Sequence, residues 1–129
     1  SEVKIGLIPA TISPYVINAI GGRAARRYFL SAERFDANTA TELGLLSECV
    51  DDDQLDARLE QLVAQLLANG PSAMRAAKQL VLDYQNCETN SALIEDSCQR
   101  IADIRVSPEG QEGLTAFLEK RQAAWHSGE

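Results

Sequence analysis

The residue with the clearest chemical potential is Glu2, which precedes a short apolar run. The run ends in a Gly-x-x-Pro turn formed by Gly6 and Pro9. A carboxyl group beside apolar side chains and a tight turn loses part of its hydration, which raises its pKa and makes it a usable proton donor near neutral pH. The alternative is an ordinary solvated glutamate, which composition alone favours. The chemistry to consider first is therefore general acid catalysis by a single carboxyl group.

The other residue types that carry chemistry lie in patterns that do not indicate a site. The single histidine, His126, lies among polar residues, and Ser13 precedes a proline with no base near it. We therefore expect an exposed histidine and a serine that caps a helix. The three cysteines have no metal-type spacing, and their odd number prevents complete pairing within the chain. We expect Cys49, Cys87 and Cys98 to be small, buried or half-buried residues in a reducing compartment.

Two charged clusters each have a functional and an ordinary interpretation. The acidic run at residues 51–53 lacks the alternating ligands, the glycine and the final glutamate of a calcium loop. Acidic residues also favour the start of a helix, so we expect a helix N-terminus there. Arg23, Arg26 and Arg27 form a basic cluster that could bind a small anion, but a solvated helix face explains it as well.

The overall charge and hydropathy limit the partners. The net charge is −7 and the isoelectric point is about 4.7, so the surface repels nucleic-acid phosphates. No apolar run reaches the ~20 residues that span a bilayer, and no signal peptide is recognisable. We therefore expect a cytoplasmic protein that binds neither nucleic acid nor membrane.

The composition predicts a mainly helical chain. Of the 129 residues, 45% are apolar but only 5% are aromatic, so a core must consist of Leu, Ile, Val and Ala, which favours packed helices. Periodicity and caps predict six or seven helices. We expect them near residues 13–22, 23–31, 37–43, 55–67, 72–84, 93–104 and 107–125.

Local signals mark the ends of several of these helices. Asp36 is the expected cap of the helix at residues 37–43, and Gly44 is its expected left-handed stop. Ser107 is the expected cap of the last helix, with Glu109 and Glu112 favourably placed in its first turn. The leucines of residues 55–67 fall at helical spacing and form one apolar stripe.

Residues 2–8 form the main candidate for a strand, and the only possible partner in this sequence is the short segment 45–50. A strand without a partner leaves its backbone groups unpaired, which is costly if they are buried. The segment therefore pairs with another chain, stays unordered, or belongs to a sheet whose other strands lie outside this sequence.

Several segments together resemble the crotonase (enoyl-CoA hydratase) family. The pattern of Glu2, Gly6 and Pro9 is followed by similar stretches at residues 24–30, 35–37, 40–46, 107–113 and 116–121. The resemblance implies a mainly α chain, the C-terminal helical portion of a crotonase fold, with at most one or two short strands. It further implies one fragment over residues 1–129. Residues 1–50 would complete the core spiral and its following helices, and residues 51–129 would form a helical oligomerisation region.

The resemblance also implies site residues. In the family, a glutamate at the position of Glu2 is one of two that hold and activate a water, and it delivers the proton to the α-carbon. The backbone amide at the position of Ala10 binds the same water, although relatives often have a more flexible glycine there. Phe117 and Lys120 correspond to residues that reach the adenine and phosphates of coenzyme A, commonly in a neighbouring subunit. Core packing for Phe117 and a solvated charge for Lys120 are the alternatives.

The implied reaction is the reversible addition of water across the double bond of a 2-enoyl-CoA. The coenzyme A thioester is the substrate, no metal or redox cofactor is implied, and the protein is expected to be a homo-oligomer, a trimer or a dimer of trimers. Residues 1–16 resemble a branch that acts on branched or carboxylated esters, such as methylglutaconyl-CoA and carboxygeranoyl-CoA hydratases. Because the second glutamate and the oxyanion amides lie upstream in the family, the chain alone is expected to be inactive. The alternatives are an isomerase of the same family and a non-catalytic helical assembly or binding module.

Overall fold

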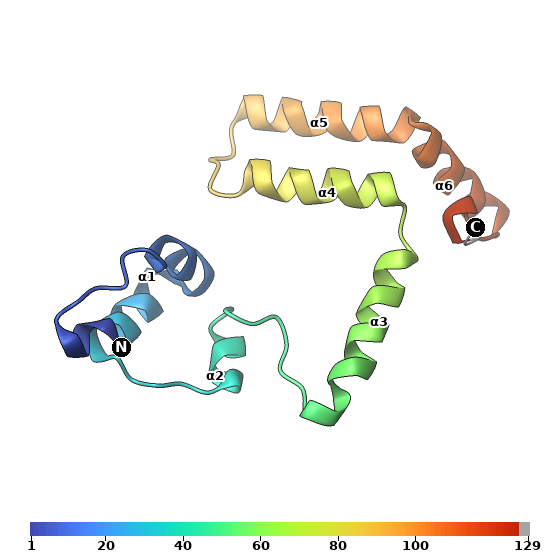
Figure 1. The fold of residues 1–129 in the computed structure, drawn as a ribbon. Helices are drawn as coiled ribbons and strands as arrows, with labels where there is room; N and C mark the ends of the chain where they lie inside the picture. The colour runs from blue at the N-terminus through green and yellow to red at the C-terminus, as the bar shows by residue number, and fades with distance from the viewer. Residues whose placement is uncertain (127–129) are drawn as a thin grey trace. The chain divides into compact units, whose positions relative to one another are not determined.

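The computed structural model describes residues 1–126, which are mainly α-helical and contain no strand. The fold class expected from the sequence is thus confirmed. The chain forms two compact units, Ser1–Leu55 and Asp56–Glu129. The helices, coloured along the chain in Figure 1, are η1 (Glu2–Ile5), α1 (Ser13–Ser31), α2 (Ala37–Glu42), η2 (Asp52–Gln54), α3 (Leu55–Leu67), α4 (Pro71–Tyr84), α5 (Ser91–Val106), α6 (Pro108–Glu119) and η3 (Ala124–His126).

The expected strand at residues 2–8 is wrong, because η1 occupies its first half. With no partner strand to bond to, the segment satisfies its amides locally. Lys4 donates to the carbonyl of Ser1 at 3.0 Å, and Leu7 donates to that of Glu2 at 3.0 Å. Gly6 ends the 3₁₀ turn with a left-handed φ of 78°, a conformation that costs glycine little.

The helix predicted to begin at Ser13 and the one predicted at residues 23–31 form one element, α1. The break between them is real, since Gly21 has a non-helical φ of 75° and ψ of 158° inside α1. The predicted cap is wrong: Ile12 occupies the N-cap position, and the Ser13 hydroxyl instead donates to the carbonyl of Ala10 at 2.9 Å. The Ser13 hydroxyl thus donates to the backbone of the preceding turn and accepts no bond from a helix amide as a cap would.

The signals around α2 are local, and the structure confirms two of them. The Asp36 carboxylate accepts a bond from the amide of Thr39 at 2.8 Å, and Gly44 is left-handed with a φ of 81°. The expected strand at 45–50 is wrong. The amides of Leu45 and Leu46 donate back to the carbonyl of Ala40, which closes the end of α2 instead of starting an extended segment.

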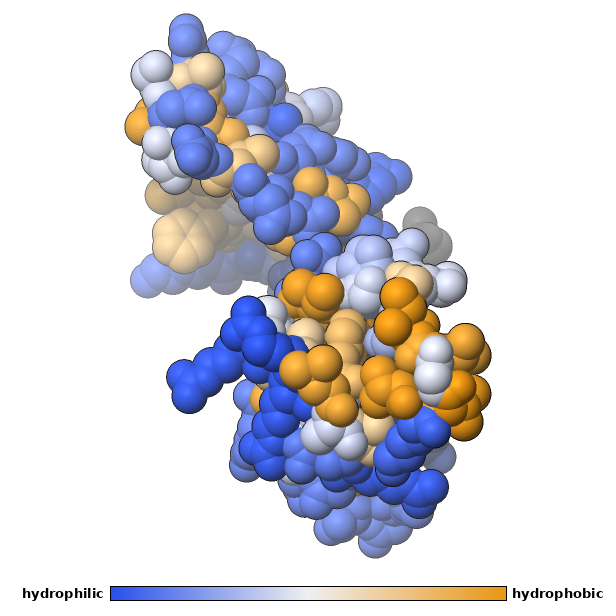
Figure 2. All heavy atoms as spheres, turned by 90° about the vertical axis from the view of Figure 1, so that its left-hand side faces the viewer, coloured by the Kyte–Doolittle hydropathy of each residue, from blue (hydrophilic) through white to orange (hydrophobic). Residues whose placement is uncertain are grey.

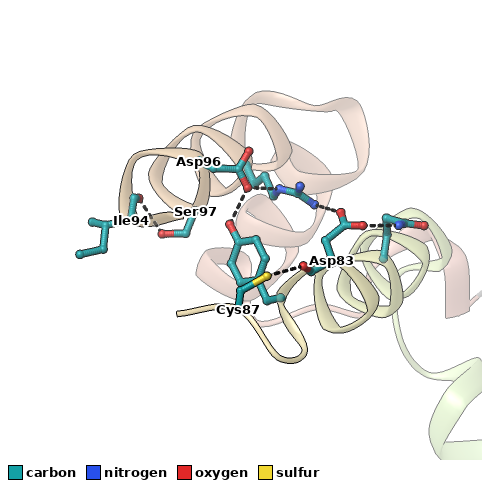
Figure 3. A network of polar contacts seen from close by, with 8 residues as sticks. Asp83, Cys87, Ile94, Asp96 and Ser97 are labelled. Carbon is teal, nitrogen blue, oxygen red and sulfur yellow. Dashed lines mark hydrogen bonds and ion pairs between the residues drawn. The ribbon is translucent and has the colours of Figure 1, made fainter. Parts of the chain in front are cut away.

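In the second unit, α4 and α5 lie side by side as a hairpin (Figure 1). A polar network joins them (Figure 3): Arg100 donates to Asp83 and to Asp96, both at 2.7 Å, and the Tyr84 hydroxyl donates to Asp96 at 2.6 Å. The bond from the Arg100 side chain, followed by one from Gln79, holds the pKa of Asp83 below its usual value. These bonds fix the register of the two helices.

The helix α6 is joined to α4 by a carboxylate from its first turn. Glu109 accepts bonds from the amides of Ser72 at 2.9 Å and Ala73 at 2.7 Å, and so caps the N-terminus of α4. Desolvation raises the pKa of Glu109, but the two amide bonds together outweigh it and the net pKa is lowered. The predicted cap of α6 itself is confirmed, since the Ser107 hydroxyl accepts from the amide of Gly110 at 3.0 Å.

Large apolar side chains remain open to solvent in both units. The hydrophobic residues buried among those described are all alanines: Ala25, Ala32, Ala40, Ala116 and Ala123. In the first unit, Ile5, Leu7, Ile8, Ile12 and Tyr15 are exposed, and apolar side chains gather on the face that Figure 2 shows. In α3, the predicted apolar stripe is also exposed. Exposed apolar faces of this kind are typical of surfaces that bind another part of a protein or another chain.

The three cysteines are exposed, so the burial expected for them is wrong. The reason is that few side chains of any kind are buried in this structure. His126 is exposed, as expected. None of the described helices is long and apolar enough to cross a membrane. The cytoplasmic location stays a prediction.

Candidate functional site

Glu2 lies in η1, in the same segment as the Gly6 turn. Its side chain is 45% exposed and accepts a hydrogen bond from the ammonium of Ser1 at 2.8 Å. This bond, followed by one from its own backbone amide, holds the pKa of Glu2 below its usual value. Desolvation, the effect that would raise the pKa, is the smallest of the effects on this carboxyl group in this structure, and the catalytic role of Glu2 stays a prediction.

The Ala10 amide belongs to the loop that follows Pro9. It donates to the carbonyl of Ile8 at 2.9 Å, while the Ala10 carbonyl accepts from Ser13. Two short-range hydrogen bonds thus close this loop on itself. Glu2 and Ala10 share one unit, and an amide at residue 10 can bind a water only after this short-range bond opens.

Phe117 and Lys120 lie at the end of α6, in the second unit. The Phe117 ring is 80% exposed, so the core-packing alternative does not describe it in this chain. Lys120 follows the last helical residue and adopts a left-handed backbone, with φ of 54° and ψ of 39°. A non-glycine residue in this region costs about 1–2 kcal/mol, so the surrounding contacts must hold Lys120 there.

Those contacts come from Arg121 and Glu112. The guanidinium of Arg121 donates through Nη1 and Nη2 to the two carboxylate oxygens of Glu112, at 2.7 and 3.0 Å. The amide of Ala124 donates to the same carboxylate at 2.9 Å. We call Glu112, Arg121 and the Ala124 amide the C-terminal clamp. An arginine that donates two parallel bonds to one carboxylate forms an ion pair that is both strong and well defined in geometry. The clamp therefore fixes the chain on both sides of Lys120.

Trp125 makes further contacts that hold the same segment in place. Its indole nitrogen donates to the carbonyl of Ala68, beyond the end of α3, at 3.2 Å. Its ring lies against Gly113: a Cβ built there would come within 2.9 Å of the Trp125 Cη2 atom. Glycine at 113 therefore makes room for the indole, and the segment after α6 is held against the body of its unit.

We expect the clamp to weaken in acid. The side-chain bond from Arg121, followed by the amide of Ala124, lowers the pKa of Glu112 from 4.5 to about 2. A carboxyl group with a lowered folded-state pKa contributes stability above its unfolded pKa and loses it as the pH falls through the folded value. The melting temperature of the chain should therefore exceed that of Glu112→Gln at neutral pH, and the difference should shrink between pH 4.5 and about 2. Circular dichroism melts over this range measure it. A difference that does not change with pH would contradict the assignment.

The basic cluster on α1 is partly neutralised. Arg23, Arg26 and Arg27 line one shallow depression, but Arg27 donates two bonds to Glu33, one of them at 3.1 Å. The bond to Glu33 raises the pKa of Arg27. Among residues 1–126, no group of three or more His, Cys, Asp or Glu side chains could hold a metal ion.

Sequence analysis missed Glu109, Glu112 and Trp125 as positioning groups. It assigned both glutamates to a favourable first helical turn, a local role. The partners of Glu109 lie 36 and 37 residues away, and Trp125 reaches back 57 residues. No sequence-spacing rule predicts contacts between residues that lie so far apart in the chain. The two glutamates and the arginine near one helix did, however, indicate that an ion pair could form there.

Comparisons with known proteins match this chain to enoyl-CoA hydratases and isomerases. The family model described as Enoyl-CoA hydratase/isomerase matches residues 1–128. A crystal structure of an enoyl-CoA hydratase from Shewanella pealeana is 50% identical, with a TM-score of 0.87, over 97% of this chain and 46% of that one. AtuE of Pseudomonas aeruginosa is 39% identical, with a TM-score of 0.86, over 96% of this chain and 48% of that one.

The curated relatives are more distant and show the same partial coverage. The 2,3-dehydroadipyl-CoA hydratase of Escherichia coli is 28% identical over 121 residues, which are 93% of this chain and 47% of that protein. The short-chain-enoyl-CoA hydratase of Clostridium acetobutylicum is 23% identical over 94% of this chain and 46% of that protein. The chain thus spans about half the length of the relatives it matches.

Proposed function

The chain belongs to the enoyl-CoA hydratase/isomerase family, and from this premise we propose that it is the C-terminal part of an enzyme that adds water to a 2-enoyl-CoA. The observation that carries the proposal is the match over residues 1–128, supported by helices that superpose on solved relatives along 97% of the chain. Glu2, with the Gly6 and Pro9 turn, lies inside that match.

In this proposal Glu2 is the acid of the reaction. The water oxygen bonds to the β-carbon and the water gives up a proton to the second glutamate that the family site implies, while the Glu2 carboxyl group delivers its own proton to the α-carbon. For that role the carboxyl group needs an apolar surrounding that raises its pKa. The exposed apolar residues that follow it, Ile5, Leu7 and Ile8, supply one side of such a surrounding.

The substrate proposed is a branched or carboxylated acyl-CoA. Residues 1–16 carry the pattern of that branch, and the name of the Escherichia coli relative, 2,3-dehydroadipyl-CoA hydratase, contains a dicarboxylic acyl group. The thioester's nucleotide end would meet Phe117 and Lys120. A homo-oligomer is part of the same proposal, because the unpartnered apolar faces of both units need cover.

The test is to measure hydration with and without the rest of the family fold. The chain alone should show no turnover of crotonyl-CoA or methylglutaconyl-CoA, because one carboxyl group without oxyanion donors lacks the largest catalytic contribution. A fusion of the upstream half of the Shewanella pealeana enzyme to Ser1 should hydrate one of them.

Each part of that experiment can fail separately. Hydration by the chain alone would contradict the incomplete site. A folded fusion that shifts the double bond without adding water would favour the isomerase alternative, and a folded fusion without either activity would favour a helical assembly module.

A further inference from the structure

The end of α6 is built as a helix stop that normally takes glycine. The amide of Lys120 donates to the carbonyl of Phe117 at 3.2 Å, and the amide of Arg121 donates to that of Ala116 at 3.0 Å. This pair of bonds defines a Schellman motif, whose left-handed position is usually a glycine. A lysine there carries a conformational cost that a glycine would remove. Left-handed non-glycine residues persist where surrounding contacts over-determine them, often at ligand sites.

The C-terminal clamp supplies those contacts without using the Lys120 side chain. Glu112 lies on α6 before Lys120, and both Arg121 and the Ala124 amide, which it binds, follow Lys120. Within residues 1–126, Lys120 makes no ion pair of its own. Its ammonium is therefore available to a ligand, while its backbone is fixed from both sides.

The exposed ring of Phe117 lies one turn before this cation. A flat aromatic face stacks on a heterocycle, and a lysine ammonium binds phosphate as a point charge. The two together fit a ligand that has both groups close together, which the nucleotide end of coenzyme A has. An aromatic ring 80% open to solvent has no role in packing this unit.

We infer that Glu112 and Arg121 are positioning residues for the nucleotide end of coenzyme A, because they hold Lys120 in its left-handed conformation beside Phe117. The inference rests on the proposed function, which supplies the ligand. It adds the residues that shape the site and that do not touch the ligand themselves.

The first experiment titrates the 129-residue chain with coenzyme A and follows the amide NMR signals of Phe117 and Lys120. Both signals should shift in the unmodified chain. Glu112→Gln should weaken the affinity about fivefold, the scale of losing one ordinary hydrogen bond, and should change the backbone coupling constant of Lys120. The matched control is Glu95→Gln on α5, an exposed glutamate of the same unit, which should change neither.

The second experiment separates positioning from general stability. Lys120→Gly should raise the melting temperature by a few degrees, since it removes backbone strain, yet it should weaken coenzyme A binding. Lys120→Arg should keep the binding. In the Lys120→Gly background, Glu112→Gln should have no further effect on affinity, because its effect acts through the lysine side chain.

The outcomes distinguish the two ideas. If coenzyme A shifts neither Phe117 nor Lys120 in the unmodified chain, the proposed nucleotide site is wrong and the positioning role is wrong with it. If the ligand binds but Glu112→Gln binds equally well, only the positioning role is wrong. If Glu112→Gln still weakens binding in the Lys120→Gly background, its effect does not act through the lysine. The clamp would then only stabilise the fold, and the positioning role would be wrong.

Discussion

Replacing Gly110 by alanine should destabilise the chain by about 3 kcal/mol, the upper part of the range for overpacking a tight contact. Gly110 lies in the first turn of α6, directly after α5. A Cβ built there would lie 2.1 Å from the carbonyl oxygen of Ile104 and 3.1 Å from that of Arg105. Both obstacles are backbone atoms, so no side-chain rotation relieves the contact and the two helices must separate.

The separation would also disturb the cap of α6. The Gly110 amide donates to the Ser107 hydroxyl at 3.0 Å, and a helix cap contributes about 1 kcal/mol. For a chain of this size, the expected loss lowers the melting temperature by roughly 10 °C. Melts followed by circular dichroism at one fixed protein concentration measure this change.

A matched glycine in the first unit provides the control. Gly22 lies within α1 and has no atom within 4 Å of a built Cβ. Gly22→Ala should therefore stabilise the helix by up to about 1 kcal/mol, because alanine has the better helix propensity. Equal melting temperatures for Gly110→Ala and the unmodified chain would show that the junction between α5 and α6 is looser than its geometry indicates.

The second large effect concerns catalysis. In the fusion with the upstream half of the Shewanella pealeana enzyme, Glu2→Gln should lower kcat by about 10²- to 10⁴-fold, the usual contribution of a general acid. The amide has the shape of the carboxyl group but cannot deliver its proton. KM should stay within about twofold, since uniform binding of the substrate does not depend on that proton.

Lys4→Gln is the control for the same turn. Lys4 is an exposed residue of η1 with no role in the proposed reaction, so its replacement should leave kcat unchanged. A fusion that keeps its full hydration rate after Glu2→Gln would remove the proposed acid and would favour the non-catalytic module. The folded state of each variant can be compared by its helical circular dichroism signal.

The parts of the fold that sequence analysis predicted correctly depend on neighbours in the chain. Asp36 caps α2 through a residue three positions away, and Ser107 caps α6 in the same way. Gly21 breaks α1 because only glycine tolerates its φ of 75° cheaply. Such signals act over one or two turns, so a single sequence contains all the information they need.

The wrong predictions depend on groups that the local pattern does not contain. A run of β-branched residues becomes a strand only when another strand offers its backbone, and residues 2–8 have none here, so they turn into η1. The apolar stripe predicted for α3 is present and exposed, but the sequence pattern does not identify the surface that would cover it. The site residues also stay predictions: the segment with Glu2 and the end of α6 with Lys120 belong to different units.

The bonds from Glu109 to the amides of Ser72 and Ala73 have a consequence for biosynthesis. The capping carboxylate is translated 36 residues after the second amide it satisfies. While a ribosome extends the nascent polypeptide between these points, α4 must exist with its leading amides hydrated, and its final geometry waits for α6 to emerge. The N-terminal cap of α4 is therefore completed only after the first turn of α6 has been synthesised.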